Sequence, residues 1–481
     1  MLLSENLLLL ASLLVFVAIL VSKVGSKLGT PSLLIFLLLG MVVGADGIGV
    51  RFDNYEIAES IGHFAMTIIL FTAGLETSFA ETRPVVKQGI VLSTLGVFIM
   101  VLLTGTFIWL ITGHQSEFGI VACFLMAAVM GSTDSASVFS VLREKKLHLR
   151  EDLSPLLELE SGSNDPMAYM LTIVLVKMLT TEDLLSKGLL PIVFVLLVQI
   201  IVGVAVGFAM GFATKWLLDR VRFSTFALTS ILILSIGFFT NAITSMLHGN
   251  GLLALYVAAI IIGNKARLTQ KKEMHHFFDG LTWLMQLTMF LMLGLLARPS
   301  QMLPLILPAL MTGLFMMLVA RPASVYLCLL PFKGLSFRAK TLVSWVGLKG
   351  AGPILFALCP VVAGLEHSSF IFDVVFLITL FSLLLQGMTL GNMAKLLKLS
   401  YEEEPRTETF GMEIPEEMGL TRDHIVTPED LASGATLRDL HLPHGIRVMM
   451  VKRSDQFLVP HGSMELQPGD HLIIIIGESD D

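Results

Sequence analysis

The sequence LESGSNDP, at residues 159–166, places two carboxylates, an amide and two hydroxyls directly ahead of an almost wholly apolar run at residues 167–179. The apolar run is typical of a membrane helix, so the polar stretch is predicted to lie within the bilayer. Burying an ionisable side chain at that depth costs about 3 kcal/mol even on insertion scales. An intramembrane carboxylate is therefore a candidate ion or proton site.

The composition of the chain is that of a membrane protein. Of its 481 residues, 54% are hydrophobic and 15% are charged, and the mean hydropathy is +0.79. Such a chain is too apolar for a soluble globule, and its apolar runs are long enough to span a bilayer. The predicted fold class is therefore an all-α polytopic membrane protein. Its three cysteines all fall inside apolar runs, so no disulfide framework is expected.

Apolar runs separated by polar breaks predict about thirteen transmembrane helices in a membrane domain at residues 1–398. Lys and Arg are concentrated in alternate loops, most densely at residues 143–146 and 265–272. Because basic loops remain in the cytoplasm, the N-terminus is expected outside and the C-terminus inside. The helices are expected to start near residues 6, 31, 58, 88, 119, 154, 189, 225, 251, 280, 303, 341 and 370.

Residue counts from the cytoplasmic ends place five ionisable side chains in one layer of the membrane. Asp165 is expected roughly 16 Å deep, near the midplane of a hydrocarbon core roughly 30 Å thick. Asp134, Arg321 and Lys349 come out at roughly 12–14 Å, and Glu160 at roughly 9 Å. Since these residues come from four different spans, we expect them to meet in one region.

Two further polar stretches are expected to interrupt helices at this depth. They are GSTDSAS at residues 131–137 and GLKGAGP at residues 347–353. Backbone released from a helix inside a membrane must find partners in the protein or in a water-lined cavity, and many secondary transporters use such breaks to bind ions. The alternative is that these are packing faces, since glycine and serine let helices approach closely.

Helical geometry separates the roles of the polar residues in the central stretch. At 100° per residue, Glu158, Ser161 and Asp165 share one face of the helix. With Ser161 one turn below and Asn164 beside it, Asp165 has the hard oxygen ligands that a small cation prefers. The sequence therefore predicts a small cation at Asp165, and the family resemblance described below implies that this cation is monovalent.

Glu160 is expected to have a different role. It points roughly 140° away from Asp165 around the helix axis. Arg321 lies at a compatible depth to neutralise it, and a buried pair of that kind is more often structural than functional.

The sequence changes character after the last predicted helix. Residues 399–423 are acidic and contain proline, which indicates a linker. Within residues 424–481, alternation at 447–459 predicts a hairpin, and the apolar run at 472–476 predicts a strand. We expect a small α+β cytoplasmic domain that docks or dimerises, because so short a chain forms only a marginal core.

Four motifs, in this order along the chain, resemble the monovalent cation:proton antiporter family, in its NhaP/CvrA-type potassium/proton branch. They are GSTDSASVFS from Gly131, ELESGSNDPMA from Glu158, ARP at residues 320–322 and GLKGA at residues 347–351. The tail contains SGATLRDL from Ser433 and LQPGDHLI from Leu466, and it resembles the RCK C-terminal (TrkA-C) ligand-sensing domain.

The resemblance implies a role for each matching residue. Asp165 would take up cation and proton by turns, with Asn164 completing an Asn-Asp pair that is associated with electroneutral exchange. Thr133 and Asp134 would belong to the unwound part of the fifth span, which crosses nearby.

The resemblance also implies that Glu160 and Arg321 form a buried ion pair, which agrees with the geometric expectation. Lys349 and Glu158 would support the site. Lys349 departs from the family pattern, because many relatives carry arginine there and a bidentate contact would be lost.

The resemblance further implies a homodimer in the bacterial inner membrane that works by elevator-like alternating access. No cofactor and no nucleic acid are expected, and the tail would bind a small molecule or nucleotide. The expected function is exchange of potassium, or also sodium, for protons, with a sodium/proton antiporter as the alternative. A potassium channel would need a Thr-Val-Gly-Tyr-Gly filter, and the sequence has none. An intramembrane hydrolase would need a Gly-x-Ser-Gly element, which is also absent, so the chain is not expected to be an enzyme.

Overall fold

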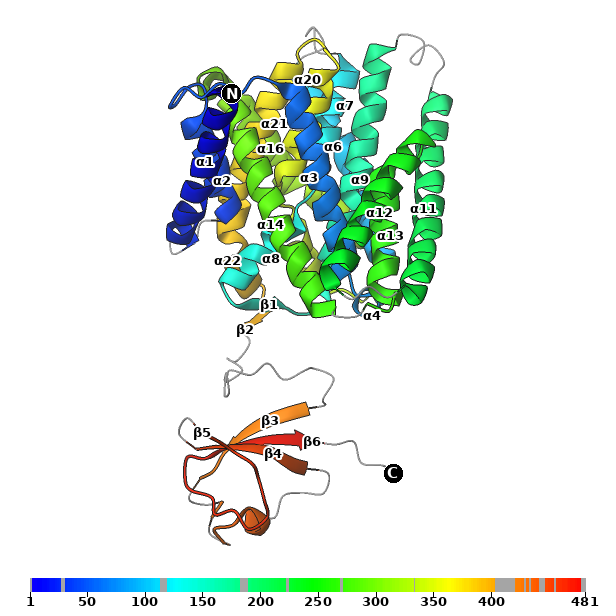
Figure 1. The fold of residues 1–481 in the computed structure, drawn as a ribbon. Helices are drawn as coiled ribbons and strands as arrows, with labels where there is room; N and C mark the ends of the chain where they lie inside the picture. The colour runs from blue at the N-terminus through cyan, green and yellow to red at the C-terminus, as the bar shows by residue number, and fades with distance from the viewer. Residues whose placement is uncertain are drawn as a thin grey trace. The chain divides into compact units, whose positions relative to one another are not determined.

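The computed structural model describes residues 2–26, 31–112, 119–181, 189–221, 225–268, 271–332, 334–402, 420–427, 430–431, 434–440, 446–453 and 456–476. The chain divides into two compact units, Met1–Tyr401 and Glu402–Asp481. The first is a bundle of helices and the second contains a small sheet (Figure 1).

The first half of the helical unit centres on α9, a long helix that contains the polar stretch and packs against α3, α5, α7, α8, α13 and α20. Its helices are α1 (Leu2–Ser26), α2 (Ser32–Val43), α3 (Tyr55–Glu76), α4 (Phe79–Thr82), α5 (Val86–Val91), α6 (Val97–Thr112), α7 (Ile120–Val129), α8 (Ser135–Glu144) and α9 (Leu153–Thr180). A short pair of strands, β1 (Leu147–Leu149) and β2 (Ser400–Glu402), lies at the bottom of the bundle in Figure 1.

The second half contains the remaining helices of the bundle. Its helices are α11 (Leu189–Arg220), α12 (Phe226–Met246), α13 (Gly251–Lys265), α14 (Lys271–Leu296), α15 (Pro299–Met302), α16 (Ile306–Phe315), α17 (Arg321–Leu329), α18 (Phe337–Trp345), α19 (Ala351–Phe356), α20 (Leu358–Val362), α21 (Ser368–Ser382) and α22 (Met388–Leu396). A 3₁₀ turn, η2 (Leu303–Leu305), follows α15. Three π-helical turns interrupt other helices: η1 (Leu92–Gly96), η3 (Met316–Ala320) and η4 (Leu383–Gly387).

The predicted class, a helical membrane protein, is confirmed. Among the described residues, seven helices are long and apolar enough to cross a membrane, and shorter apolar helices accompany them. Helical segments begin close to the predicted starts, except that α14 begins at Lys271 rather than near residue 280. The helix begins earlier because its first two turns are amphipathic: Met274 and Phe278 are buried, while residues 271–273 are charged and exposed and so do not extend the apolar run. The count of thirteen spans stays a prediction.

Both predicted helix interruptions are present. Helix α7 ends at Val129 and α8 begins at Ser135, while α18 ends at Trp345 and α19 begins at Ala351. Helix α9, by contrast, continues through Pro166 without a break. The side chain of Asn250, at the start of α13, donates to the carbonyl oxygen of Pro166 at 2.7 Å and so ties the two helices together at this level.

A glycine ladder brings α11 and α13 together. A Cβ atom added at Gly203, Gly207 or Gly211 would lie 2.7–2.9 Å from atoms of the α13 segment. This small-residue spacing is typical of close contact between membrane helices. Here the ladder joins two helices of one chain.

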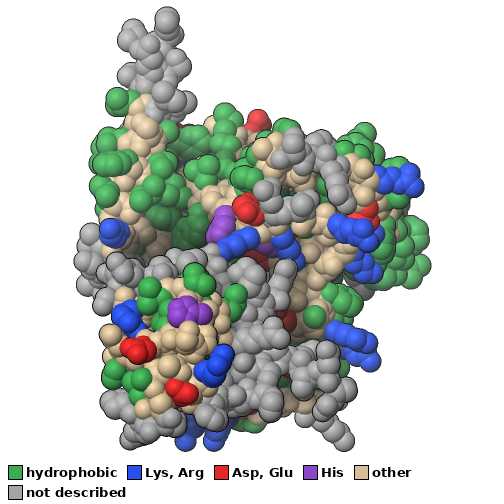
Figure 2. Space-filling view, turned by 60° about the horizontal axis from the view of Figure 1, so that its bottom comes forward, with side chains coloured by type: hydrophobic (Ala, Val, Ile, Leu, Met, Phe, Trp, Pro, Cys, Tyr) green, Lys and Arg blue, Asp and Glu red, His purple; other side chains and the backbone are tan. Residues whose placement is uncertain are grey.

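Figure 2 turns the bottom of Figure 1 forward and shows Lys and Arg side chains on that face. The basic loops before α9 and α14 belong to this end, as the topology prediction requires. The assignment of this end to the cytoplasm stays a prediction.

The second unit contains a four-stranded antiparallel sheet in the order β3-β6-β4-β5. Its strands are β3 (Leu420–Ile425), β4 (Ile446–Arg453), β5 (Gln456–Leu458) and β6 (His471–Ile476). The predicted hairpin is the β4–β5 pair, and the predicted strand is β6. The helical part that the structure describes is a 3₁₀ turn, Leu437–Leu440.

The predicted linker overlaps this sheet at its end. Residues 403–419 lie outside the described residues. Strand β3 begins at Leu420, earlier than the expected domain start at residue 424, because Leu420 pairs with Ile476 at the end of β6. The sequence did not predict this strand, because Thr421, Arg422 and Asp423 are polar and give no hydrophobic pattern.

Candidate ion-binding site

The two interrupted helices cross each other and are bonded through their backbones. The N–H of Asp134 donates to the carbonyl oxygen of Leu348 at 2.9 Å. The Lys349 ammonium donates to the carbonyl oxygen of Ser132 at 2.8 Å, and the Lys349 N–H donates to Ser382 Oγ at 2.9 Å. Backbone groups released by both breaks therefore find partners in the protein, as the interior of a membrane protein requires.

Two glycines make this crossing possible. A Cβ atom at Gly350 would overlap the carboxylate of Asp134, and one at Gly352 would lie 2.8 Å from Ser132 Oγ. The glycines in GLKGAGP are thus needed for space as well as for weakening the helix. The alternative prediction was that this stretch is a face for close helix packing. The structure shows both features at the same place: the helix is interrupted and the two segments pack closely.

Helix α9 holds the first break through two of its polar side chains. Asn164 Nδ2 donates to Thr133 Oγ1 at 2.5 Å, and its Oδ1 accepts from the Thr133 N–H at 3.3 Å. Ser161 Oγ donates to the Thr133 carbonyl oxygen at 2.7 Å and accepts from the Ser135 N–H at 3.0 Å. Asn164 and Ser161 therefore position the unwound segment beside Asp165.

Asp165 is half-buried beside the crossing. Ser132 Oγ donates a hydrogen bond to Asp165 Oδ1, and it is the only hydrogen-bond partner of this carboxylate among the residues that the structure describes. Asp134 and Lys349 are the charged groups that interact with it electrostatically. The second carboxylate oxygen, Oδ2, is thus available to a proton or a cation.

Asp134 is engaged differently. It is the N-cap of α8, where its Oδ1 accepts from the Ser137 N–H at 3.0 Å and its Oδ2 accepts from the Ser137 hydroxyl. Capping of this kind stabilises a helix start and explains why α8 resumes at Ser135. The structure places Asp134 close enough to Asp165 for the two carboxylates to repel, so a bound cation or proton would relieve that repulsion.

Glu160 and Arg321 form a bidentate ion pair. Arg321 Nη1 donates to Glu160 Oε1 at 2.5 Å, and Arg321 Nη2 donates to Glu160 Oε2 at 2.9 Å. The side chain of Arg321 is 6% exposed and that of Glu160 is 1% exposed. Arg321 Nε has no hydrogen-bond partner among the described residues and lies beside Gly347. The pair thus rests against the second break, on the side of α9 away from Asp165.

The two residues predicted to support the site lie in different places. Lys349 interacts electrostatically with Arg321, Glu160 and Asp165, so it is within electrostatic reach of both the ion pair and the carboxylate. Glu158 is half-buried, and its charged neighbours include Glu81 and Arg143.

Sequence reasoning missed several residues at the site. Ser132 lies within a stretch that the sequence singled out, but its contact with Asp165 depends on how the break folds. Tyr256 of α13 had no local signal at all. Its ring fills the space beside Gly162, and it interacts electrostatically with Asp165 and Glu158.

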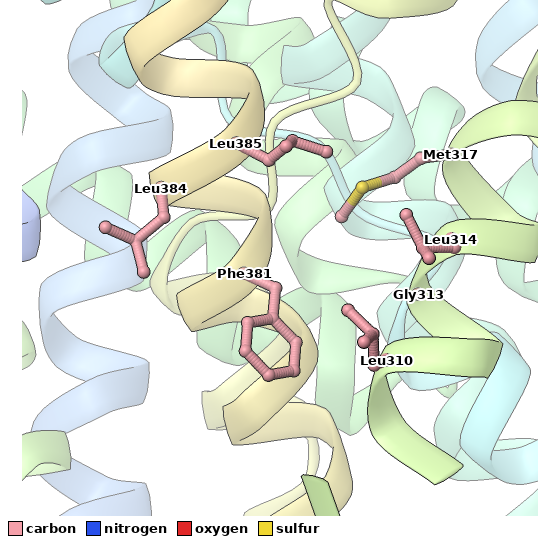
Figure 3. Close-up of a pocket in the computed structure, with 7 residues that line it drawn as sticks. All are labelled: Leu310, Gly313, Leu314, Met317, Phe381, Leu384 and Leu385. Atoms are coloured by element: carbon pink, nitrogen blue, oxygen red, sulfur yellow. The ribbon is translucent and has the colours of Figure 1, made fainter. Parts of the chain in front are cut away.

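An apolar cavity of about 290 Å³ lies between α16 with η3 and α21 with η4 (Figure 3). Its lining consists of apolar side chains and one glycine, namely Leu310, Gly313, Leu314, Met317, Phe381, Leu384 and Leu385. Such a lining offers no ligands to a cation, so this cavity is not the ion site.

Comparisons with known proteins match both units. The family model for the sodium/hydrogen exchanger, transmembrane, matches residues 12–396, and that for the TrkA-C domain matches residues 423–480. The chain is 38% identical over 474 residues to the K(+)/H(+) antiporter NhaP2 of Shewanella sp. (strain ANA-3), which covers 97% of this chain and 80% of the relative. It is 36% identical over 460 residues to the K(+)/H(+) antiporter NhaP of Alkalimonas amylolytica, with coverage of 95% and 75%.

The fold is also similar to a solved structure, the sodium proton antiporter MjNhaP1 from Methanocaldococcus jannaschii at pH 8. The TM-score is 0.66 at 21% identity, and the match covers 78% of this chain and 97% of the other.

Proposed function

Because the chain belongs to the sodium/hydrogen exchanger family, we propose that it exchanges potassium ions for protons, with Asp165 binding the two in turn. The family resemblance inferred from four sequence motifs is thereby confirmed, and the chain is a multi-pass membrane transporter. The observation that supports potassium is that two relatives named as potassium/proton antiporters match at least 95% of this chain.

The arrangement around Asp165 supports its role as the exchanging group. Its carboxylate lies beside the first break, where Ser132 is its hydrogen-bond partner among the described residues, and it interacts electrostatically with Lys349 of the second break. Asn164 and Ser161 hold the backbone of the first break beside it. Carboxylate, hydroxyl and carbonyl oxygens of this kind are suitable ligands for a monovalent cation.

Exchange follows from competition at this one carboxylate. A proton and a cation exclude each other at Asp165, and either one neutralises its charge. An unpaired carboxylate is costly to move through the membrane interior, so the transporter reorients readily only when Asp165 is neutralised. Each reorientation then carries one ion in one direction, and no further signal between the two sides is required.

The remaining residues have structural roles in this proposal. The Glu160–Arg321 pair and Lys349 fix the second break, while Asp134 caps α8 and adds negative charge beside the ion. We further propose a homodimer in the bacterial inner membrane with the N-terminus outside and the C-terminus in the cytoplasm. The TrkA-C domain would adjust the rate by binding a small molecule or nucleotide.

Transport by purified protein in liposomes tests the proposal. A pH-sensitive dye inside the vesicles is followed as potassium, sodium, rubidium or lithium is added outside. We expect dequenching with potassium and rubidium and a weaker response to sodium. A response to sodium and lithium with none to potassium would make the protein a sodium/proton antiporter while leaving the role of Asp165 intact.

A pair of variants tests the role of Asp165 in the same assay. Asp165→Asn keeps the shape of the side chain but removes the charge, so exchange should be abolished. Glu56→Gln is the matched control, because Glu56 is an exposed carboxylate in the first turn of α3 and should exchange ions at the wild-type rate. Exchange by Asp165→Asn driven by a pH gradient would refute the assignment.

A further inference from the structure

Two polar side chains of the α21–η4 segment bind the backbone of the second break. Ser382 is the last residue of α21, and Gln386 lies in the π-helical turn η4 that follows it. The Ser382 hydroxyl donates to Gln386 Oε1 at 2.6 Å and accepts from the Lys349 N–H at 2.9 Å. Gln386 Nε2 donates to the carbonyl oxygen of Trp345 at 2.9 Å. The two side chains therefore contact both ends of the break and are also bonded to each other.

The two backbone groups that they bind belong to a single hydrogen bond of a regular helix. In a continuous helix, the N–H of Lys349 would donate to the carbonyl oxygen of Trp345, four residues earlier. Helix α18 ends at Trp345, and in the structure the Lys349 N–H donates to Ser382 while the Trp345 carbonyl oxygen accepts from Gln386. Ser382 and Gln386 thus replace the two partners of one helical hydrogen bond.

Burial makes this replacement necessary. Ser382 is 0% exposed, Gln386 is 1% exposed and Lys349 is 2% exposed. A backbone N–H or carbonyl group that is buried without a partner is costly, above all inside a membrane, so the helix can open here only if neighbouring groups supply new partners. A π-helical turn such as η4 is rare and is often found at functional sites.

We propose that Ser382 and Gln386 are positioning residues for cation/proton exchange, because they keep the second break unwound and so direct Lys349 toward the first break. The inference rests on the exchange at Asp165 proposed above. It assigns the two side chains a role in the geometry of the site, although neither of them contacts Asp165 in the structure.

The position of Lys349 connects this pair to the ion site. The Lys349 ammonium donates to the Ser132 carbonyl oxygen at 2.8 Å, and the Ser132 hydroxyl donates to Asp165. If the helical bond from Lys349 to Trp345 formed, the segment between them would wind into a turn, in which each residue is rotated by about 100° from the one before. The Lys349 side chain would then point in another direction and would leave the Ser132 carbonyl oxygen.

The experiment separates the stability of the fold from the geometry of the site. The variants are Gln386→Met, Ser382→Ala and the double variant that carries both changes. Each is studied by thermal melting in detergent and by potassium/proton exchange in liposomes, with equal amounts of folded protein. Thr379→Val is the control, because Thr379 is a buried residue of α21 whose hydroxyl has no hydrogen-bond partner among the described residues.

Each single variant leaves a buried polar group without its partner, so the melting temperature should fall and exchange should drop about tenfold or more. In the double variant, the Lys349 N–H and the Trp345 carbonyl oxygen can bond to each other, so the melting temperature should return toward that of the wild type. Exchange by the double variant should stay about tenfold or more below the wild-type rate, because Lys349 no longer meets Ser132. A purely structural pair would recover transport together with stability. Thr379→Val should match the wild type in both measurements.

Three results would overturn the proposal. A double variant that melts below both single variants would show that the helical bond does not form when the pair is removed. A stable double variant that exchanges ions at the wild-type rate would exclude a positioning role, and so would wild-type exchange by Gln386→Met. A wild-type protein that does not exchange potassium for protons would refute the proposed function instead, and the melting temperatures would still decide whether the two side chains replace the helical bond.

Discussion

The N–H of Asp134 donates to the carbonyl oxygen of Leu348 at 2.9 Å, which joins two unwound segments that lie far apart in the sequence. The Lys349 side chain adds a second link by donating to the Ser132 carbonyl oxygen. The crossing is thus fixed from both sides, and the Asp165 carboxylate is held against it by Ser132. Reorientation of the site is therefore expected to move both breaks together with α9.

The first prediction concerns the space at this crossing. Gly350→Ala places a Cβ atom against the Asp134 carboxylate, so the carboxylate or the backbone must shift. Overpacking of this kind costs about 1–3 kcal/mol, and we expect about a tenfold or greater loss of exchange rate in liposomes. Gly280→Ala in α14 is the matched control, because a Cβ atom there meets no other atom and should leave transport unchanged.

The second prediction concerns the Glu160–Arg321 pair, whose two side chains are almost completely buried. Glu160→Gln or Arg321→Gln alone leaves an uncompensated charge and should lower the free energy of unfolding by about 3–5 kcal/mol. The double variant should recover part of that loss, because no single charge remains. Thermal melting in detergent, read as a double-mutant cycle, measures the coupling.

The pair formed by Lys215 and Asp219 on α11 provides the control for this cycle. Its N···O distance is also 2.5 Å, but its side chains are 34% and 25% exposed. Lys215→Gln should therefore cost only about 0.5 kcal/mol. Strictly additive losses for Glu160→Gln and Arg321→Gln would show that the two residues are not energetically coupled.

Hydrophobic patterning predicted the helices and both breaks because a polar residue inside the membrane must find its hydrogen-bond partners within the protein. A glycine-rich or serine-rich run at bilayer depth has few alternatives to an interrupted helix with internal partners. Counting residues along helices also placed Asp165 and Asp134 at one level, since the rise of a helix is constant.

Contacts between side chains of different helices could not be predicted in the same way. The hydrogen bonds between the Asn164 amide and Thr133 are an example, since they depend on how the unwound segment folds against α9. The role of Asn164 as a ligand beside Asp165 stays a prediction. Tyr256 lies in a helix whose sequence contains no distinctive motif. Its position depends on how α13 rotates against α9, which only the packed structure determines.

The third prediction concerns the tail domain. Arg453 Nε and Nη2 donate to Asp470 at 2.9 and 2.7 Å, and with the Gln467 N–H these bonds lower the pKa of the Asp470 carboxyl. Because the folded pKa lies below the unfolded value of about 3.9, this stabilisation is fully present at neutral pH and is lost as the pH falls below that value.

Asp470→Asn should therefore lower the stability of the tail domain by about 1–2 kcal/mol at neutral pH, with a shrinking difference from wild type below pH of about 4. Amide hydrogen exchange of β4 and β6 in the full-length protein measures the change. His461→Ala, at an exposed side chain of the same domain, should exchange like the wild type. Equal protection of β4 in the Asp470→Asn variant would contradict a stabilising role for the pair.

The fourth prediction separates transport from regulation. All the intramembrane charges discussed above belong to the unit Met1–Tyr401, and the TrkA-C match begins at residue 423. A chain that ends at residue 405 should therefore still exchange potassium for protons in liposomes, but with an altered dependence on pH or on added nucleotides. The Asp165→Asn variant of the same shortened chain gives the background rate, since it lacks the titrating group. Complete loss of exchange in a shortened protein that is inserted and folded normally would place part of the transport machinery in the tail.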